Sequence, residues 1–399
     1  MATKSELAKS LEANIKWFEQ SGVMSPADGS WGVGERIVLT AGNTALEKTL
    51  KCFPAYTAHG DHVVMEHRRP DCNFEAALMF LLAAKALDKP AWRDTARNLL
   101  TYLHRRSGMR NPDLSGAGKY PPGVWKWAHH QWDFGIWFDD NAWNCAIPLL
   151  IAKLDPELAA EFDLENTALA LADSLAAGFE RQFVSDEPDG KGFKWAGDLK
   201  SPHWGSLVVM ALALAGEEKH AAPIARYDAH VRENMDSFTT SECAYVVLGA
   251  SATRSQDTAR LFADRLLGKM DAATGNIPSE WGKEAPVGQR LVDLVYTQNW
   301  AVLGLQAAAA LTGDAKYRQA LEKALGLVIS IQDATPAAHL RGCWRGMYDL
   351  DAEAWGGGDC FEGGASSVYS GWTNAPISIS IATELLATTK GHEGFHGIF

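Results

Sequence analysis

The chain has 399 residues and a formal net charge of −12, so it can bury a sizeable core without a disulfide or a metal. The acidic balance, with no stripe of Lys or Arg, argues against nucleic-acid and anionic-membrane partners. No run reaches 18 consecutive apolar residues, and the amphipathic N-terminus lacks the apolar segment of a signal peptide. We therefore expect a cytoplasmic protein that is a monomer or homodimer.

The first predicted element is an amphipathic helix over about residues 5–20. Six Ala/Leu-rich helical runs follow, each after a loop rich in Trp, Gly and short polar residues. These runs begin near Asn73, Asn141, Ser201, Ser241, Thr297 and Ser370. A second, more charged helical pattern follows each of the first five runs, over residues 91–105, 164–183, 219–234, 255–269 and 314–331.

This alternation predicts stacked helix pairs, which can close into an all-α (α/α)6 toroid of six helical hairpins. The first run of each pair is apolar on nearly all sides, as expected for an inner helix. The helix at 5–20 would be the outer partner of the last inner helix. We expect one domain over residues 1–390 and a tail over 391–399, with short strands confined to loops. In a closed ring the six inner helices begin on one face.

Tryptophans concentrate at that face. Most of the 15 lie in connecting loops or in the first turn of an inner run, and only Trp17 and Trp92 lie on outer helices. Flat aromatic faces suit the C–H faces of sugar rings, so the set predicts a carbohydrate-binding cleft. Packing of large loops is the alternative explanation.

The segment WFDDNAWN at 137–144 is the sharpest local motif, because it places two carboxylates at a helix start. Both could simply cap the helix. Consecutive helical residues point about 100° apart, so one Asp would face the cleft and the other would hold the loop. We expect Asp140 to be catalytic, with Asp139 as the next candidate.

A second acid would lie across the sugar. Asp71 and Glu362 are the preferred candidates at the other inner-helix starts. Further acids at these starts are Glu75, Glu242, Glu280, Asp293 and Asp359.

Candidate substrate-binding residues are polar or aromatic groups at the same starts. They are Trp143, His203, Trp204, Gln298, Asn299, Trp300, Tyr369, Trp372 and Asn374. Arginines also gather in the loops, at Arg68, Arg69, Arg290, Arg341 and Arg345, and Arg341 or Arg345 is the preferred candidate to bind the carboxylate of a uronic acid in bidentate fashion. Structural ion pairs explain these arginines equally well. No spacing of His, Asp and Glu indicates a metal site, and no phosphate or dinucleotide motif indicates a cofactor.

The six-hairpin layout, the segment WFDDNAWNCAIPLL and the Trp-rich loops together resemble the (α/α)6-barrel glycosidase superfamily. The segment is similar to the helix start of unsaturated glucuronyl and rhamnogalacturonyl hydrolases, which implies that Asp140 is the general acid/base. It is also similar to the paired-Asp segment of endo-mannanases of that superfamily, which implies that Asp139 and Asp140 form the essential pair. N-acylglucosamine 2-epimerases share the barrel, but their His-bearing motifs are not found.

The sequence therefore predicts a glycoside hydrolase that acts on an oligosaccharide containing a uronic acid, by carboxylate acid/base catalysis. A sugar epimerase with His203 or His67 moving protons is the first alternative. A polysaccharide lyase is the second, and an α-solenoid scaffold that binds protein partners is the non-enzymatic alternative.

Overall fold

The structure is a computed structural model that describes residues 2–130, 136–185, 193, 195–279, 290–358 and 364–388. Its α-helices in chain order are α1 (Lys4–Gln20), α2 (Leu46–Cys52), α3 (Pro70–Ala86), α4 (Ala91–Thr101), α5 (Phe138–Leu154), α6 (Pro156–Phe162), α7 (Leu164–Phe179), α8 (Pro202–Ala215), α9 (Ala221–Glu233), α10 (Thr240–Ala252), α11 (Gln256–Lys269), α12 (Gln298–Thr312), α13 (Ala315–Ser330) and α14 (Ala375–Ala387). None of the helices in these ranges is long and apolar enough to cross a bilayer.

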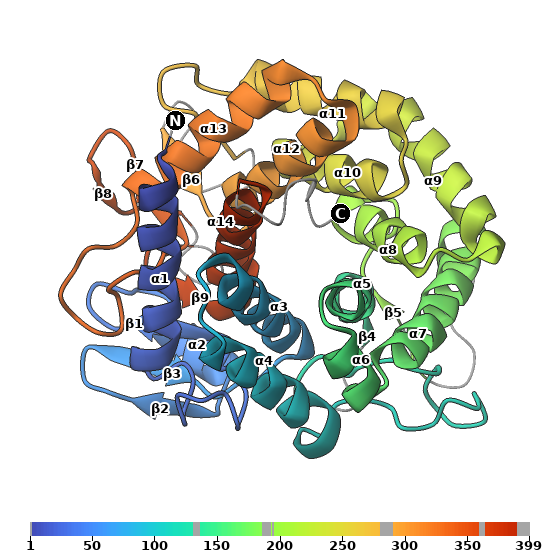
Figure 1. Ribbon diagram of the computed structural model, residues 1–399, viewed down its shortest axis with the longest axis horizontal. Helices are drawn as coiled ribbons and strands as arrows, with labels where there is room; N and C mark the ends of the chain where they lie inside the picture. Colours follow the sequence, from blue (N-terminus) through green and yellow to red (C-terminus); the bar gives the residue numbers. More distant parts are fainter. Residues whose placement is uncertain are drawn as a thin grey trace.

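Six helices form an inner ring (Figure 1). Going round it, α3, α5, α8, α10, α12 and α14 each contact the next, and α14 contacts α3 again. Outside them lie α4, α7, α9, α11 and α13, each packed on the inner helix that precedes it. The predicted (α/α)6 toroid is confirmed, and its ring is closed.

The inner helices are buried on nearly every side, and small residues let their backbones approach closely. A Cβ atom added to Gly249 of α10 would lie 2.8 Å from the carbonyl oxygen of Ser206 in α8. A Cβ atom added to Gly304 of α12 would lie 3.2 Å from the carbonyl oxygen of Ala244 in α10. These helices could not pack at this separation with larger residues at the two glycines.

The first helix closes the ring from outside, since α1 packs against α14 as predicted. Asn14 of α1 donates to the side-chain oxygen of Asn374 (2.8 Å) and to the carbonyl oxygen of Gly342 (2.9 Å). It also accepts a hydrogen bond from Ser378 of α14 (2.9 Å). This buried polar seam joins the two ends of the described chain.

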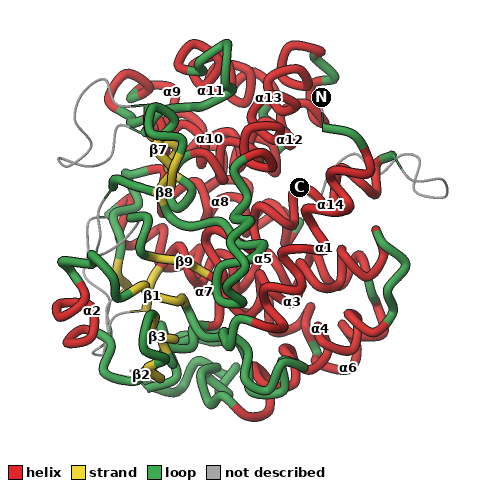
Figure 2. Tube along the Cα trace, turned by 90° about the vertical axis from the view of Figure 1, so that its left-hand side faces the viewer, coloured by secondary structure: helices red, strands yellow, loops and turns green. Residues whose placement is uncertain are grey.

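The strands lie in the connecting loops, as the sequence predicts. They are β1 (Arg36–Leu39), β2 (Tyr56–Ala58), β3 (His62–Met65), β4 (Ile136–Trp137), β5 (Trp195–Ala196), β6 (Leu291–Asp293), β7 (Met347–Asp349), β8 (Ala354–Trp355) and β9 (Ser367–Tyr369). The largest sheet has the order β2-β3-β1-β9, and its strands are antiparallel, with Ile37 of β1 opposite Val368 of β9. Figure 2 shows β1, β3, β7, β8 and β9 gathered toward one end of the ring. This sheet brings the segment between α1 and α3 beside the segment that leads into α14.

Candidate active site

A pocket of about 650 Å³ opens where the inner helices begin. Its lining residues come from the sheet and its flanks, from the end of α2, from the starts of α3, α5 and α8, and from the segments that lead into α5, α12 and α14. They are Glu35, Arg36, Lys51, Cys52, Phe53, Arg69, Trp127, Trp137, Asp139, Asp140, His203, Trp204, Val295, Tyr296, Tyr369 and Trp372. The convergence of inner-helix starts that the sequence predicts is therefore present, with α10 contributing none of these lining residues.

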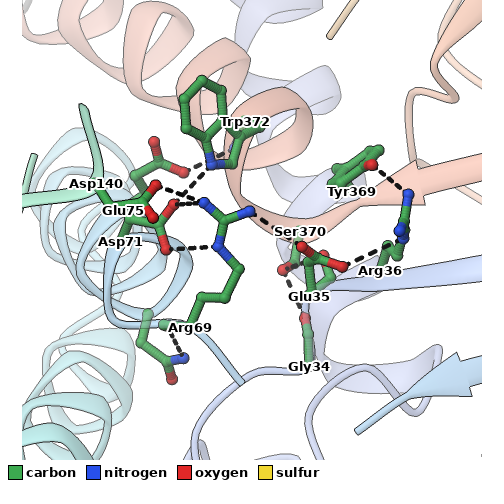
Figure 3. A network of polar contacts seen from close by, with 11 residues as sticks. Gly34, Glu35, Arg36, Arg69, Asp71, Glu75, Asp140, Tyr369, Ser370 and Trp372 are labelled. Carbon is green, nitrogen blue, oxygen red and sulfur yellow. Dashed lines mark hydrogen bonds and ion pairs between the residues drawn. The ribbon is translucent and has the colours of Figure 1, made fainter. Parts of the chain in front are cut away.

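Arg69, the residue before α3, is at the centre of a buried network of acids (Figure 3). Its Nη2 atom donates to Asp140 Oδ1 (2.6 Å) and to Asp71 Oδ2 (2.7 Å), and its Nε atom donates to Asp71 Oδ1 (3.1 Å). Its Nη1 atom donates to Glu35 Oε1 (3.1 Å). One guanidinium group thus joins acids from three separate segments.

Carboxyl groups outnumber guanidinium groups in this buried region. The acids are Glu35, Asp71, Glu75, Asp139 and Asp140, and the two arginines are Arg36 and Arg69, all of them at most 9% exposed. Ionising every carboxyl would leave a net negative charge in a medium of low dielectric, which is costly. Some of these acids must therefore keep a proton.

The surroundings of two of these acids favour the protonated form of the carboxyl group. Burial raises the pKa of Asp140 well above its usual range, and the charges of Asp71 and Asp139 add to this against the opposing charge of Arg69. Burial also raises the pKa of Glu75, whose neighbour Asp71 adds to the effect. Burial thus favours the protonated form of Asp140 and of Glu75.

Glu35 behaves differently, although it is just as buried. Burial opposes its ionisation, but Arg36, His67 and Arg69 together hold the pKa of Glu35 below its usual value. Arg36 lies 3.2 Å from Glu35 and also donates to the hydroxyl of Tyr369. On this side of the pocket, Glu35 is therefore held in ion pairs with Arg36 and Arg69.

Asp139 lies next to Asp140 but has other partners. Its Oδ2 atom is 3.0 Å from Nε2 of His203, in the first turn of α8. The His203 ring is nearly parallel to the indole of Trp372, with an interplanar angle of 8° and centroids 5.7 Å apart. Oδ1 of Asp139 and Oδ2 of Asp140 have no hydrogen-bond partner among the described residues. Each acid therefore has one buried oxygen that makes no hydrogen bond within the described residues.

Trp372 has a strained backbone, with φ 52° and ψ −28°. Its backbone N–H donates to Glu75 Oε2 (2.8 Å), and its indole N–H donates to Asp71 Oδ2 (2.7 Å). A Cβ atom on the preceding Gly371 would lie 2.4 Å from Glu75 Oε2, so this approach requires glycine. Asp71 and Glu75 thus fix the aromatic wall of the pocket from behind.

Six of the predicted site residues come together in the pocket. They are Asp139, Asp140, His203, Trp204, Tyr369 and Trp372. Asp71, the other described acid among the preferred candidates, is fully buried behind the pocket wall. Glu362 lies outside the described residues, as do Glu280 and Asp359.

Other predicted binding residues lie behind the pocket and bond to nearby backbone. Gln298 accepts from the N–H of Ile277 (2.8 Å), and Asn374 donates to the carbonyl oxygen of Trp344 (2.9 Å). Asn299 donates to the carbonyl oxygen of Trp372 and to that of Val295. These amides order the loops that carry the pocket.

Two predicted tryptophans and two arginines also lie away from the pocket lining. Trp143 and Trp300 stack on each other, with centroids 5.5 Å apart, and both are almost fully buried. Arg345 is bound to Asp333 (2.8 Å), and Arg341 is exposed. None of these four residues lines the pocket.

Sequence reasoning missed the pocket residues that come from the sheet and from α2. Among them are Glu35, Arg36 and Phe53. They belong to the segment between α1 and α3, whose place beside the pocket depends on the pairing of β1 with the distant β9. Arg69 is one of the loop arginines that the sequence singles out, and it lies at the ring face because it directly precedes the proline of an inner-helix start.

Comparison with known proteins shows the fold. No family model and no curated protein sequence matches the chain. The cellobiose 2-epimerase of Bacillus thermoamylovorans B4167 matches with a TM-score of 0.55 and 12% identity, covering 80% of this chain and 88% of that one. A sugar epimerase from a ruminal bacterium matches with a TM-score of 0.55, 11% identity and the same coverage. At these identities the likeness is one of architecture, and it agrees with the (α/α)6 barrel seen here.

Proposed function

We propose that this chain is a glycoside hydrolase that cleaves an oligosaccharide in the pocket between Asp139, Asp140 and Trp372. The observation that supports this most directly is the pair Asp139 and Asp140. They are adjacent acids on one pocket wall, and their environments differ. Two carboxyl groups in different environments allow one to give a proton while the other stabilises positive charge.

Asp140 is the proton donor in this proposal. Burial raises the pKa of Asp140 well above its usual range, which favours the protonated form that a general acid needs. As the glycosidic C–O bond breaks, this proton moves to the leaving oxygen. A water molecule then adds its hydroxyl to the anomeric carbon and gives its other proton to the Asp140 carboxylate, which restores the acid. Arg69, on Oδ1, stabilises the carboxylate while it is ionised.

Asp139 stabilises the positive charge that develops on the sugar ring in the transition state. Its contact with His203 fixes its orientation, and its Oδ1 atom is unbonded within the described chain. His203 is itself held between Trp372 and the edge of Trp204, whose centroid is 4.7 Å away. Asp139 and His203 thus lie among aromatic side chains, whose flat faces suit sugar rings.

An uncharged sugar fits this pocket better than the uronic acid that the sequence suggests. Of the arginines predicted to bind a carboxylate, Arg341 and Arg345 do not line the pocket. Arg69 does line it, but its guanidinium group is already bound by Glu35, Asp71 and Asp140, and Arg36 is paired with Glu35. The surplus of acids would also repel an anionic substrate.

A panel of neutral and uronate-containing oligosaccharides, assayed for new reducing ends, tests the function. We expect turnover of a neutral member and its loss in the Asp140→Asn variant. Glu242→Gln is the matched control, because Glu242 is an inner-helix acid that does not line the pocket. A protein that releases no reducing ends from any member would contradict the proposal.

A sugar epimerase is the second candidate, and the His203–Asp139 pair favours it. An imidazole 3.0 Å from a carboxylate can move a proton at a sugar carbon. The two matching epimerase structures show that this fold supports such chemistry. Product analysis separates the candidates, because an epimerase leaves the number of reducing ends unchanged, and His203→Asn would then abolish turnover.

A further inference from the structure

A second pocket, with a volume of about 310 Å³, lies between α7 and the segment at 116–122. Ser174 of α7 donates to the carbonyl oxygen of Pro122 (2.7 Å), which holds this segment on the helix. Among the described residues, none lines both this pocket and the active-site pocket. The two are neighbours, because Trp195 of β5 lines the second pocket and Trp137 of β4, its partner strand, lines the first (Figure 1). Binding sites for small molecules begin at about this volume.

The walls of the second pocket are aromatic. Tyr120 and Phe193 line it, with ring centroids 6.5 Å apart and an interplanar angle of 51°. Trp195 is stacked on Phe138, the first residue of α5, with centroids 4.6 Å apart and an interplanar angle of 7°. Phe138 is fully buried, so the close-packed core holds the indole of Trp195 in place. Flat aromatic faces of this kind suit the C–H face of a sugar ring.

Two cationic side chains lie beside these aromatic faces. Arg181, two residues after the end of α7, lines the pocket and is exposed. The ammonium group of Lys119 lies 5.1 Å from the ring centroid of Tyr120. A guanidinium group is always charged and can bind a carboxylate in bidentate fashion. The open side of the pocket therefore favours a ligand with an anionic group.

Two acids near the pocket already have partners. Asp173, which also lines it, lies 2.6 Å from Nζ of Lys219 and 3.1 Å from Nε2 of His220. Asp113 accepts a hydrogen bond from the backbone N–H of Gly118 (2.8 Å), on the opposite wall. Local partners thus offset the charge of both carboxylates, so these acids oppose the binding of an anion only weakly.

We propose that the second pocket is an accessory binding site for an acidic sugar. The sugar ring lies against Tyr120 and Phe193, and the guanidinium group of Arg181 binds the carboxylate of the sugar. The active-site pocket has the opposite character, since buried acids outnumber arginines there. Binding at the second pocket does not depend on the reaction proposed for the first, so the two proposals can fail separately.

Galacturonate and galactose are suitable probes, because they differ only at C6, which is a carboxylate in galacturonate. Calorimetric titration of the full chain, with ligand-observed NMR for weak binding, measures the affinity for each. We expect galacturonate to bind at least tenfold more tightly than galactose, and its affinity to fall as salt is added. Arg181→Gln should remove this difference, whereas Arg232→Gln should keep it. Arg232 is the matched control, because it is an exposed arginine near the end of the outer helix α9 and lines neither pocket.

A second variant fills the pocket and leaves its charge unchanged. Ala177 is an exposed residue of α7 that lines the pocket, so Ala177→Trp should abolish galacturonate binding without disturbing the core. Ala225→Trp, at an exposed position of α9, is the control for this change and should bind as wild type does. Circular dichroism and Tm should show that both variants fold.

The proposal is overturned if galacturonate does not bind or binds no more tightly than galactose. It is also overturned if Arg181→Gln or Ala177→Trp leaves the affinity for galacturonate unchanged, or if either control variant lowers it equally. Because binding is measured without turnover, these outcomes say nothing against hydrolysis in the active-site pocket, and a failure of that hydrolysis leaves the accessory site untouched.

Discussion

Two inner helices, α5 and α10, both begin with an acid in their first turn, but the two acids have different surroundings. Asp140 of α5 is bound through one oxygen to Arg69, has no described partner for the other, and lines the pocket. Glu242 of α10 closes a capping box with Thr239 and also accepts from Ser201 (2.5 Å). One oxygen of Glu242 is thus occupied by its own helix cap and the other by Ser201, the N-cap of α8.

A carboxylate at the start of an inner helix is therefore not sufficient evidence of a catalytic role. Capping satisfies the free N–H groups of the helix and is sufficient reason for an acid at that position. The acid of α5 is distinguished by its charged neighbours, Arg69 and Asp71, and by the burial that raises its pKa.

Replacing Asp140 with Asn should have the largest effect. The variant should fold, because Asn keeps the size of the side chain, but it removes the acid and should lower kcat/KM on the order of 10³-fold. Steady-state kinetics on the active oligosaccharide measures this. Near wild-type turnover in the Asp140→Asn variant would contradict a catalytic role for Asp140. An equal loss of activity in Glu242→Gln would show that the acids of α5 and α10 do not differ in function.

Replacing Asp71 with Asn tests the influence of a charged neighbour on Asp140, because it removes the charge of Asp71 and leaves Asp140 in place. Burial is the main cause of the raised pKa of Asp140, and the Asp71 charge adds to it. Without that charge the pKa of Asp140 should fall, so the alkaline limb of the pH–rate profile should move to lower pH. At a fixed pH above the limb, activity should drop about tenfold for every pH unit by which the limb moves.

A structural role for Asp71 alone predicts a different result. The variant would then lose activity equally at every pH, and the limb would stay where it is in wild type. The pH–rate profile therefore separates the two roles even if the variant is less stable.

Glu75→Gln should change the pH dependence of stability. Burial raises the pKa of Glu75 in the folded chain above its ordinary value of 4.5. The contribution of Glu75 to the free energy of unfolding is therefore fully present below pH 4.5, and it is lost as the pH rises toward the pKa of the folded state. Denaturant unfolding between about pH 5 and pH 8 should show wild-type stability falling with pH. The variant should lack up to about 1.4 kcal/mol of that fall per pH unit. An unchanged slope would show that Glu75 is ionised in the folded chain.

Thr239→Ala should have the smallest effect. It removes the side-chain cap of α10 and should cost about 1 kcal/mol of unfolding free energy. Activity should stay at the wild-type level, because the capping box lies outside the pocket lining. A loss of activity larger than the loss of stability explains would place α10 in the catalytic machinery after all.

The ring could be predicted from the sequence because its determinants are local. Inner helices such as α12 are apolar on all sides, outer helices are amphipathic, and their alternation fixes the pairing. The acids at the start of α5 were readable for the same reason. Helix geometry places Asp139 and Asp140 on the ring face without any knowledge of distant segments.

The remaining part of the site depends on long-range pairing. Arg36 reaches Tyr369 only because β1 pairs with β9, more than 300 residues away, and no local pattern encodes that register. Conversely, Gln298 and Asn299 have the composition of ligand-binding residues but bond to loop carbonyls. Composition cannot distinguish an amide that binds a sugar hydroxyl from one that binds a peptide group, since both make the same hydrogen bonds.

The seam between α1 and α14 also governs the order of assembly. During synthesis α1 leaves the ribosome before the other helices of the ring, yet the Asn14 side chain finds its partner on Asn374, 360 residues later. Until then the side of α1 that packs on α14 lacks the helix that covers it, although Phe18 also contacts Phe80 of α3. This side of α1 therefore stays uncovered in the nascent chain until α14 has been made, when the two helices pack and close the toroid.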